Sequence, residues 1–222
     1  MPEEVEGPLD GPGTRVVVLA TNNAKKLVEL RRLVAKAGAD VTVLGLADLP
    51  RYPEPAETER TFVGNALLKA RACVAATGLP ALADDSGIAV DVLNGMPGVR
   101  SARWSGPDAT DERNNALLLA QLDDVTDADR TAHFEAAVAL VLPDGTERTT
   151  TGRMDGRLLR APEGDNGFGY DPLFVADGQQ VSNGALDPVA KDRISHRGQA
   201  VRAMVPVLLA ELARDGRAGQ EA

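Results

Sequence analysis

Cysteine and histidine are scarce in this chain of 222 residues, which has Cys73, His133 and His196 and no others of either kind. A single thiol excludes an intrachain disulfide, and these three side chains are too few soft ligands for a structural zinc site. Cys73 lies among alanines in a predicted helix, and His133 lies in a predicted strand. We therefore interpret both as structural residues.

Apolar runs long enough for a membrane span, roughly 18 residues, are also missing. The first 14 residues are acidic and rich in Pro and Gly, unlike a signal peptide, and the net charge of −9 argues against a broad basic surface for nucleic acid. The P-loop motif is absent as well. We expect a cytoplasmic protein that binds neither membranes nor nucleic acid, and that needs clustered cations or a metal to bind a phosphate.

The spacing of apolar residues predicts an α/β fold. Residues 15–20 form a β-branched run typical of a buried strand, residues 24–37 repeat Leu and Val at helical spacing, and residues 41–46 begin a second strand. A strand, a helix and a strand in succession favour this class. Further helices are predicted at 61–77, 110–122 and 196–213, and further strands at 81–93, 131–142 and 146–159.

We expect residues 15–213 to form one domain between disordered tails at 1–14 and 214–222. Polar clusters fall where predicted strands give way to loops or helices, which is where ligands gather in open α/β sheets. These clusters are residues 21–26, 84–86, 166–171 and 191–197.

The first cluster, ATNNAKK, stands at a predicted helix N-terminus. Free backbone N–H groups and the helix dipole favour an anion there, and Lys26 adds a positive charge. The alternative is an ordinary helix cap with solvated lysines.

The second cluster places Asp84 and Asp85 side by side in the otherwise apolar run ALADDSGIAV. Adjacent carboxylates in an apolar setting need a cation or hydrogen bonds. A divalent cation would suit them, with Glu57 as a further ligand, and a free carboxylate beside a metal-bound triphosphate can deprotonate a water. The alternative is a turn in which both carboxylates bond to local backbone.

The third cluster, NGFGYDP, sets Phe168 between two glycines, so that backbone can approach a ligand and a base can stack on the ring. The alternative is a turn with Phe168 and Tyr170 in the core. The fourth cluster packs Lys191, Arg193, His196 and Arg197 together, and His196 with Arg197 could read a purine carbonyl. The alternative is a set of exposed cations at a helix end.

Taken in order, these segments resemble the inosine triphosphate pyrophosphatases, also called dITP/XTP pyrophosphatases. The resemblance is collinear over about residues 15–213, and all five motifs together are very specific. The motifs are ATNNAKKLVEL (20–30), TFVGNALLKA (61–70), LADDSGIAVDVLNGMPGVRSAR (82–103), GFGYDPLF (167–174) and SHRGQA (195–200).

The resemblance implies Mg²⁺-dependent hydrolysis of ITP, dITP and XTP to the monophosphate and pyrophosphate, which cleanses the nucleotide pool. It also implies a homodimer and an elongated α/β fold, with a long mixed central sheet flanked by helices and an active-site cleft between two lobes. Matched residue by residue, Asp85 would be a metal ligand and the proton acceptor, with Glu57 and Asp84 supporting the metal. The implied substrate-binding residues are Thr21, Asn22, Asn23, Ala24, Lys25, Lys26, Ser86, Phe168, Gly169, Tyr170, Asp171, Lys191, His196 and Arg197.

Two positions depart from the pattern of the resemblance. Gly64 stands where many members have Glu, which puts weight on Glu57, and Arg100 stands where many have Tyr. Two other functions stay open: a pyrophosphatase of different base preference, such as the septum-inhibition type, and a nucleotide sensor that binds without cleaving.

Overall fold

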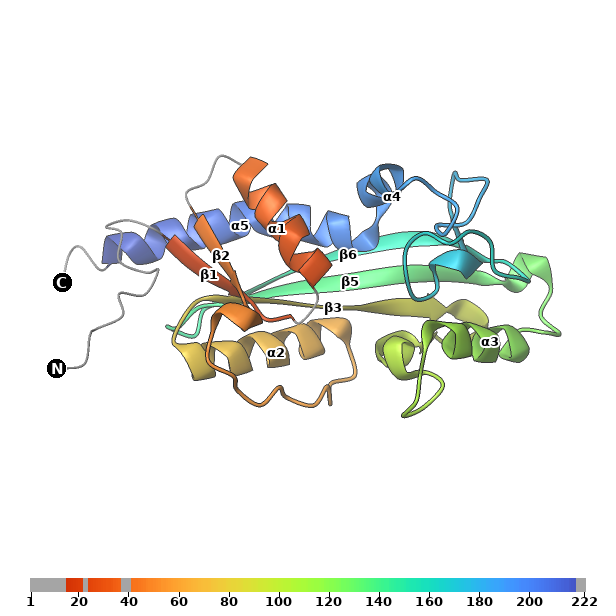
Figure 1. Cartoon of the computed structure of the whole chain (residues 1–222), viewed down its shortest axis with the longest axis horizontal. Coiled ribbons are helices and arrows are strands. Elements are labelled where there is room, and N and C mark those ends of the chain that lie inside the picture. The colour runs from red at the N-terminus through yellow and green to blue at the C-terminus, as the bar shows by residue number, and fades with distance from the viewer. Residues whose placement is uncertain (1–14, 22–23, 37–40, 219–222) are drawn as a thin grey trace.

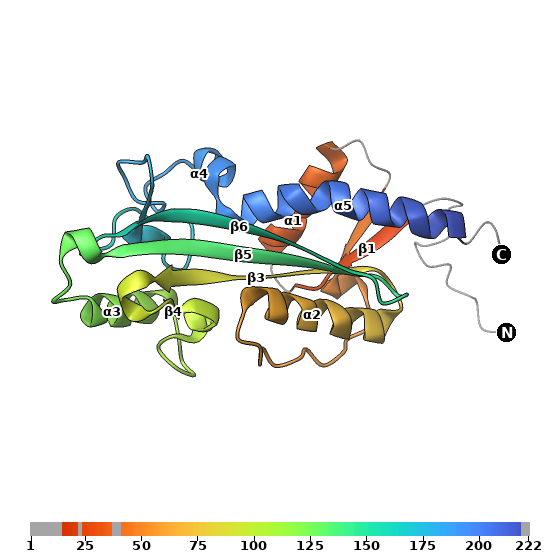
Figure 2. The ribbon, with the colours of Figure 1, turned by 180° about the vertical axis from the view of Figure 1, so that it is seen from behind.

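A mixed seven-stranded sheet forms the centre of the computed structural model, which describes residues 15–21, 24–36 and 41–218 (Figure 1). Three of its strands, β3, β5 and β6, are long and run along most of the elongated molecule (Figures 1 and 2). The strands are β1 (Arg15–Leu19), β2 (Val41–Gly45), β3 (Ala81–Val90), β4 (Met96–Pro97), β5 (Thr131–Val141), β6 (Glu147–Leu158) and β7 (Phe174–Ala176).

The strand order is β2-β1-β3-β5-β6-β7, and β4 pairs with the far end of β3. β1 is parallel to both β2 and β3, whereas β5, β6 and β7 follow as antiparallel neighbours. The sheet is therefore parallel at one end and antiparallel over the rest. This confirms the expected α/β class with a mixed sheet.

Helices cover both faces of the sheet. Helices α1 and α5 lie on one face, and α2 and α3 lie on the other (Figures 1 and 2). None of the helices in the described part of the chain is long and apolar enough to cross a membrane. The α-helices are α1 (Ala24–Lys36), α2 (Phe62–Thr77), α3 (Asp111–Gln121), α4 (Pro188–Ile194) and α5 (His196–Ala218), and the short 3-10 helices are η1 (Leu46–Asp48), η2 (Asp91–Leu93), η3 (Gly98–Arg103), η4 (Asp127–Asp129) and η5 (Asp171–Leu173).

Successive side chains of β3 point to opposite faces of the sheet, so they pack into two layers of the core. Leu82 packs with Leu140 and Met204 on the side of α1 and α5, whereas Ala81 and Ala83 pack under α2. Small residues on the second side let α2 lie close to the sheet, where its buried Cys73 joins the core as expected. The same alternation decides where the polar residues that follow Ala83 point.

Most predicted elements are confirmed within a few residues. Thr61 and Thr110 each cap a helix by accepting a hydrogen bond from a backbone N–H three residues on. Helix α4 was not predicted, because its seven residues are too few for a helical apolar pattern. The last helix extends to Ala218, beyond the expected end at 213, and it continues through Pro206.

Gly152 lies where β6 passes the first turn of α5. A Cβ at this position would come within 2.1 Å of the His196 carbonyl oxygen and 2.8 Å of the Ala200 nitrogen. Only glycine allows this approach, and it fixes the helix end that carries His196 and Arg197. We therefore expect Gly152→Ala to lower the free energy of unfolding by about 1–3 kcal/mol, because backbone must shift to make room.

Urea unfolding measures this effect. The exposed Thr149 in the same strand supplies the control, since Thr149→Ala is expected to change stability by less than about 0.5 kcal/mol. Equal stability of the two variants would show that the helix end moves freely relative to β6.

Candidate active site

Asp84 and Asp85 lie in β3 just past the end of the neighbouring strand β1. β1 pairs only with Ala81 and Leu82 of β3, so the two aspartates have β5 on one side and no strand on the other. The carboxyl ends of the parallel strands β1 and β2 lie beside this part of β3. That is the usual position of a ligand site in an α/β sheet.

The two aspartate side chains leave β3 on opposite faces. Asp84 points toward α1 and α5, where Lys26 donates hydrogen bonds of 2.9 and 2.7 Å to its two oxygens. Asp85 points toward α2, where Asn65 donates to Oδ2 at 3.0 Å and Lys69 donates to Oδ1 at 3.3 Å. Each carboxylate therefore has its own lysine, which removes the conflict between adjacent like charges.

Asp84 is the more strongly ionised of the two. Burial alone would raise its pKa, but Lys26 and Arg197 outweigh burial and lower the pKa to about 2. Arg197 reaches Asp84 Oδ2 from Nε at 3.3 Å and donates from Nη2 to Ser86 Oγ at 2.9 Å. Asp84 is thus a fixed negative charge between two cations.

Asp85 is shifted in the other direction. Burial raises its pKa, and the negative charge of Glu57 adds to the increase, while Lys69 and Asn65 oppose it. A carboxylate with a raised pKa accepts a proton more readily than an exposed one. Among the residues that we predicted as catalytic or metal-binding, Asp85 is therefore the one suited to act as a base.

Glu57 is held at the same position by two cations. Lys69 donates to its Oε1 at 3.2 Å, and Arg103 donates to its Oε2 at 2.5 Å. Burial would raise the pKa of Glu57, but these hydrogen bonds from Arg103 and Lys69 outweigh burial and lower it. Lys69 therefore joins Glu57 to Asp85.

A pocket of about 360 Å³ adjoins this ionic region, although Asp85 itself is not among its lining residues. Glu57, Lys69, Asp84 and Arg103 line it together with Lys26 and Thr21. Of the other residues predicted near the phosphates, Ala24 and Lys25 begin helix α1, and Asn22 and Asn23 lie outside the described residues. The pocket therefore combines positive charges with carboxylates.

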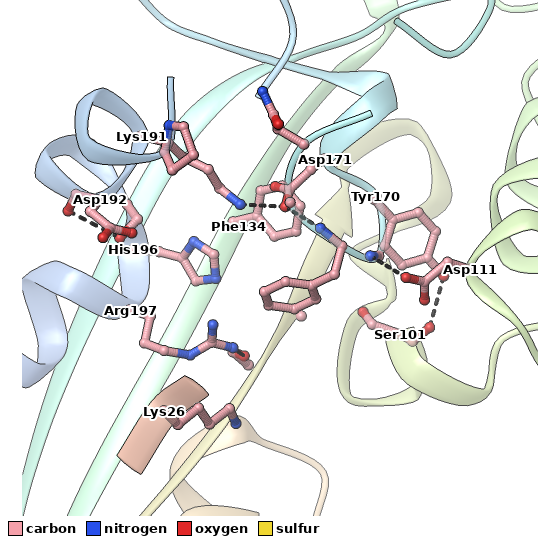
Figure 3. Close-up of a pocket in the computed structure, with 18 of the residues that line it drawn as sticks. Lys26, Ser101, Asp111, Phe134, Tyr170, Asp171, Lys191, Asp192, His196 and Arg197 are labelled. Carbon is pink, nitrogen blue, oxygen red and sulfur yellow. Dashed lines mark hydrogen bonds and ion pairs between the residues drawn. The ribbon is translucent and has the colours of Figure 1, made fainter. Parts of the chain in front are cut away.

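A larger pocket, of about 490 Å³, lies beside it and shares Lys26 (Figure 3). Lys191, His196, Arg197 and Lys26 follow one another along one side of it, with Tyr170 on the opposite side (Figure 3). The sequence-predicted residues that line this pocket are Lys26, Ser86, Phe168, Gly169, Tyr170, Asp171, Lys191, His196 and Arg197.

Phe168 and Tyr170 have different roles, although the sequence places them together. Phe168 is 50% exposed, and the Lys191 ammonium and the Arg197 guanidinium each lie 5.3 Å from its ring centre. Tyr170 is buried in the core and donates its hydroxyl to the Ser101 carbonyl at 2.8 Å. The core interpretation therefore holds for Tyr170, while Phe168 offers its ring to the pocket.

Asp171 fixes the turn that presents Phe168. Its carboxylate accepts a hydrogen bond from the Phe168 N–H at 2.9 Å and forms an ion pair with Lys191. Gly169 continues the turn: its N–H donates to Asp111, and its carbonyl accepts from Asn115. The position of the Phe168 ring is therefore set by polar groups from three elements.

His196 is a neutral side chain at physiological pH. Burial, followed by the charges of Arg197 and Lys191, lowers its pKa to about 3. The imidazole stacks on Phe134, with ring centres 4.8 Å apart and planes inclined by 9°. Its buried Nδ1 has no hydrogen-bond partner within the described part of the chain. A neutral imidazole has one donor and one acceptor nitrogen, which allows it to discriminate between ligand groups.

A family model described as the Ham1 family matches residues 17–207. The chain belongs to the Ham1 family. A dITP/XTP pyrophosphatase of Cutibacterium acnes is 57% identical over 198 residues, which are 88% of this chain and 97% of that protein. A dITP/XTP pyrophosphatase of Nocardia farcinica is 58% identical over 195 residues, 87% of this chain and 95% of that protein.

Solved structures give the same result. A nucleoside-triphosphatase, or dITP/XTP pyrophosphatase, of Mycobacterium abscessus is 50% identical with a TM-score of 0.76, covering 87% of this chain and 99% of that one. A HAM1 protein of Coxiella burnetii is 39% identical with a TM-score of 0.82, covering 87% of this chain and 98% of that one. The resemblance inferred from the five motifs is thereby confirmed.

The two departures from the Ham1-type motifs have different surroundings. A Cβ at Gly64 would lie 2.7 Å from the Glu59 Cβ and 3.1 Å from the Thr61 hydroxyl, so glycine leaves room here for the loop that leads from Glu57 to α2. Arg100 is exposed in η3, outside the two pockets described above. Nothing in the structure explains why arginine stands there.

Asn65, Lys69 and Arg103 were not predicted as site residues. Asn65 and Lys69 are four residues apart on α2, so they share a helix face, and that face lies over Asp85. The spacing in TFVGNALLKA was therefore a usable signal. No pattern in the sequence indicates a role for Arg103, because its contact with Glu57 depends on how η3 packs against the loop that contains Glu57.

The carboxylates of this Ham1-family site fit a magnesium ion. In the described part of the chain no three His, Cys, Asp or Glu side chains are grouped as a metal site. Mg²⁺ needs only one or two carboxylates, with phosphate oxygens and water completing its shell. Glu57 and Asp85 meet this requirement, because both already contact the single positive charge of Lys69 at 3.2 and 3.3 Å.

That both aspartates support one cation stays a prediction, and Asp84 lines the same pocket as Glu57 and Lys69. The Asp84 oxygens accept hydrogen bonds from Lys26, whereas those of Asp85 contact Asn65 and Lys69 on the other face of β3. The physical reason is the period of two along a strand, which sends adjacent side chains to opposite faces.

Proposed function

We propose that this Ham1-family protein is a dITP/XTP pyrophosphatase, which hydrolyses ITP, dITP and XTP to the monophosphate and pyrophosphate and so cleanses the nucleotide pool. One observation carries the proposal: a pocket that can take a base and a second pocket lined by cations and carboxylates share Lys26 as a lining residue. The relatives that carry this name are 57% and 58% identical over most of their length, which supports the same chemistry here.

In the proposed reaction, water adds across the bond between the α and β phosphates, and Asp85 takes the proton that the water loses. Asn65 and Lys69 orient the Asp85 carboxylate, and burial keeps it basic. Glu57 and Asp85 would hold Mg²⁺, which when bound neutralises phosphate charge. Lys26 and Lys69 contribute further positive charge to phosphate oxygens, and pyrophosphate leaves.

The base is selected in the larger pocket. Phe168 offers a stacking face, and the donors of Arg197 and neutral His196 suit a carbonyl at the purine edge. An adenine would present an amino group there, so that a hydrogen-bond donor of the base would face the donors of the protein with no acceptor between them. The turn around Gly169 to Asp171, with Lys191, would enclose the sugar and the base.

Three finer features belong to the same proposal. The region of α1 and α2 and the region of α3 and α4 would form two lobes, with the substrate cleft between them. We also propose that the protein is a homodimer and that it acts in the cytoplasm. The two lobes and the dimer follow from the family resemblance.

Pyrophosphate release from ITP, XTP, dITP, GTP and ATP, with Mg²⁺ and with EDTA, tests the proposal. We expect Mg²⁺-dependent release from ITP, dITP and XTP at a kcat/KM at least about 100-fold above that for ATP. EDTA should reduce release to the background level, because without the metal the Glu57 and Asp85 carboxylates repel the triphosphate.

Other results would support the alternatives. Similar turnover of all five nucleotides would retain the metal chemistry and reject base selection, in favour of a pyrophosphatase of broader preference. Binding of ITP without release of pyrophosphate would indicate a nucleotide sensor.

A further inference from the structure

Asp84 joins the two pockets of the proposed active site. On the phosphate side it accepts both hydrogen bonds of Lys26, and on the base side it contacts Arg197 Nε at 3.3 Å. Arg197 lines the larger pocket, Asp84 lines the smaller one, and Lys26 lines both. The cation that meets the base and the cation that meets the phosphates therefore share one carboxylate.

The three charges are shielded from water, so each depends strongly on the others. The exposed fractions of the side chains are 6% for Asp84, 19% for Lys26 and 13% for Arg197. Charges interact more strongly in such an environment than at the surface. Lys26 and Arg197 repel each other, and Asp84 is the group that holds them together.

One side of Asp84 is apolar. Behind the cluster lies a small cavity whose remaining lining residues are apolar: Leu19, Leu30, Leu82, Val138, Val201 and Met204. These residues offer no polar group that could replace a cation moving away from Asp84. On the other side Asp84 lines the smaller pocket with Lys69 and Arg103, but its hydrogen bonds are with Lys26 and Arg197. Movement of Arg197 toward a ligand therefore changes the interaction of Asp84 with Lys26.

We propose that Asp84 is a specificity-determining positioning residue, which makes the placement of Lys26 on the phosphates depend on what Arg197 meets on the base. This inference rests on the proposed function. A base with a carbonyl at the purine edge accepts a hydrogen bond from Arg197 and leaves Asp84 to orient Lys26. A base without this acceptor leaves Arg197 on Asp84, and Lys26 is then less well placed.

The test compares ITP with purine riboside 5′-triphosphate, the same nucleotide with hydrogen in place of the carbonyl. In the unchanged protein we expect kcat/KM to favour ITP on the order of 100-fold, with part of the preference in kcat. In Asp84→Asn the preference should fall to about threefold or less. Asp155→Asn is the matched control, because Asp155 pairs with Arg153 on the exposed surface and should leave the preference unchanged.

A double-variant cycle separates this role from simple loss of charge. If Asp84 acts through Arg197, then Asp84→Asn combined with Arg197→Gln should reduce the preference no further than either change alone. If Asp84→Asn lowers turnover of both nucleotides by the same factor and keeps the preference, Asp84 orients Lys26 at the phosphates regardless of the base. The inference is then wrong.

Binding supplies a readout that needs no turnover. Calorimetry with inosine monophosphate and purine riboside monophosphate should show a preference for the former in the unchanged protein and its loss in Asp84→Asn. A preference that Asp84→Asn retains would overturn the inference. Absence of pyrophosphate release from ITP in the unchanged protein would instead overturn the proposed function, while these binding measurements would still report on Asp84.

Discussion

Replacement of Asp85 by asparagine is expected to lower kcat for ITP by about 10³-fold or more, which is the contribution of a well-placed general base. The amide has nearly the shape of the carboxylate, so the contact with Asn65 can be kept by an amide flip, and the fold should not change. It cannot accept the proton of the attacking water. KM should change much less than kcat, because the effect concerns mainly the transition state.

Steady-state kinetics with ITP and Mg²⁺ measure this loss, and an unchanged urea midpoint shows that the variant is folded. Asp155→Asn again provides the matched control, because it removes a carboxylate at an exposed ion pair. Near-normal turnover by Asp85→Asn would exclude Asp85 as the base and would leave Glu57 as the candidate base.

The pH dependence of the unchanged enzyme follows from the same residue. Because burial raises the pKa of Asp85, activity should fall on the acid side as the carboxylate becomes protonated. His196 should not contribute to a fall near pH 6, because its lowered pKa, about 3, keeps it neutral there. The base preference should therefore be the same at pH 6 and pH 8.

The sequence was sufficient to predict the elements and the gathering of the polar clusters. Helix caps at Thr61 and Thr110, and the strand on each side of Asp84, follow from local chemistry and alternation. As expected for strand ends, residues that follow β1 line one pocket, and residues of β3 and α5 line the pocket beside it.

The pairing of each carboxylate with its cation could not be predicted in the same way. It depends on α1 and α2 covering opposite faces of β3, which is a tertiary feature. The polar residues Asp84 and Asp85 interrupt an apolar run, which is typical of a break in a strand. We therefore expected both carboxylates to support the same cation. The strand in fact continues through them, and its period of two separates Lys26 from Lys69.

A second buried charge, Arg130, is expected to matter for stability rather than for catalysis. Its side chain is 2% exposed, and no ion pair in the described part of the chain includes it. Instead its guanidinium donates to the carbonyls of Leu122, Leu158 and Leu159 at 2.7, 3.1 and 2.7 Å. These contacts join the end of α3 to the segment after β6.

Arg130→Met should therefore lower the free energy of unfolding by roughly 3 kcal/mol or more. Methionine fills much of the volume, but three carbonyls lose the guanidinium as a donor. The Leu122 oxygen keeps the Val125 N–H, whereas the Leu158 and Leu159 oxygens lose their contact with Arg130, and each group left unsatisfied costs about 1–3 kcal/mol before water relieves it. Arg160→Met is the matched control, since Arg160 also contacts backbone carbonyls but is 53% exposed, so its loss should cost less than about 1 kcal/mol. Urea unfolding of the two variants measures the difference. Equal losses would mean that water replaces the Arg130 donors at no cost, and that this end of the molecule is held by its apolar core alone.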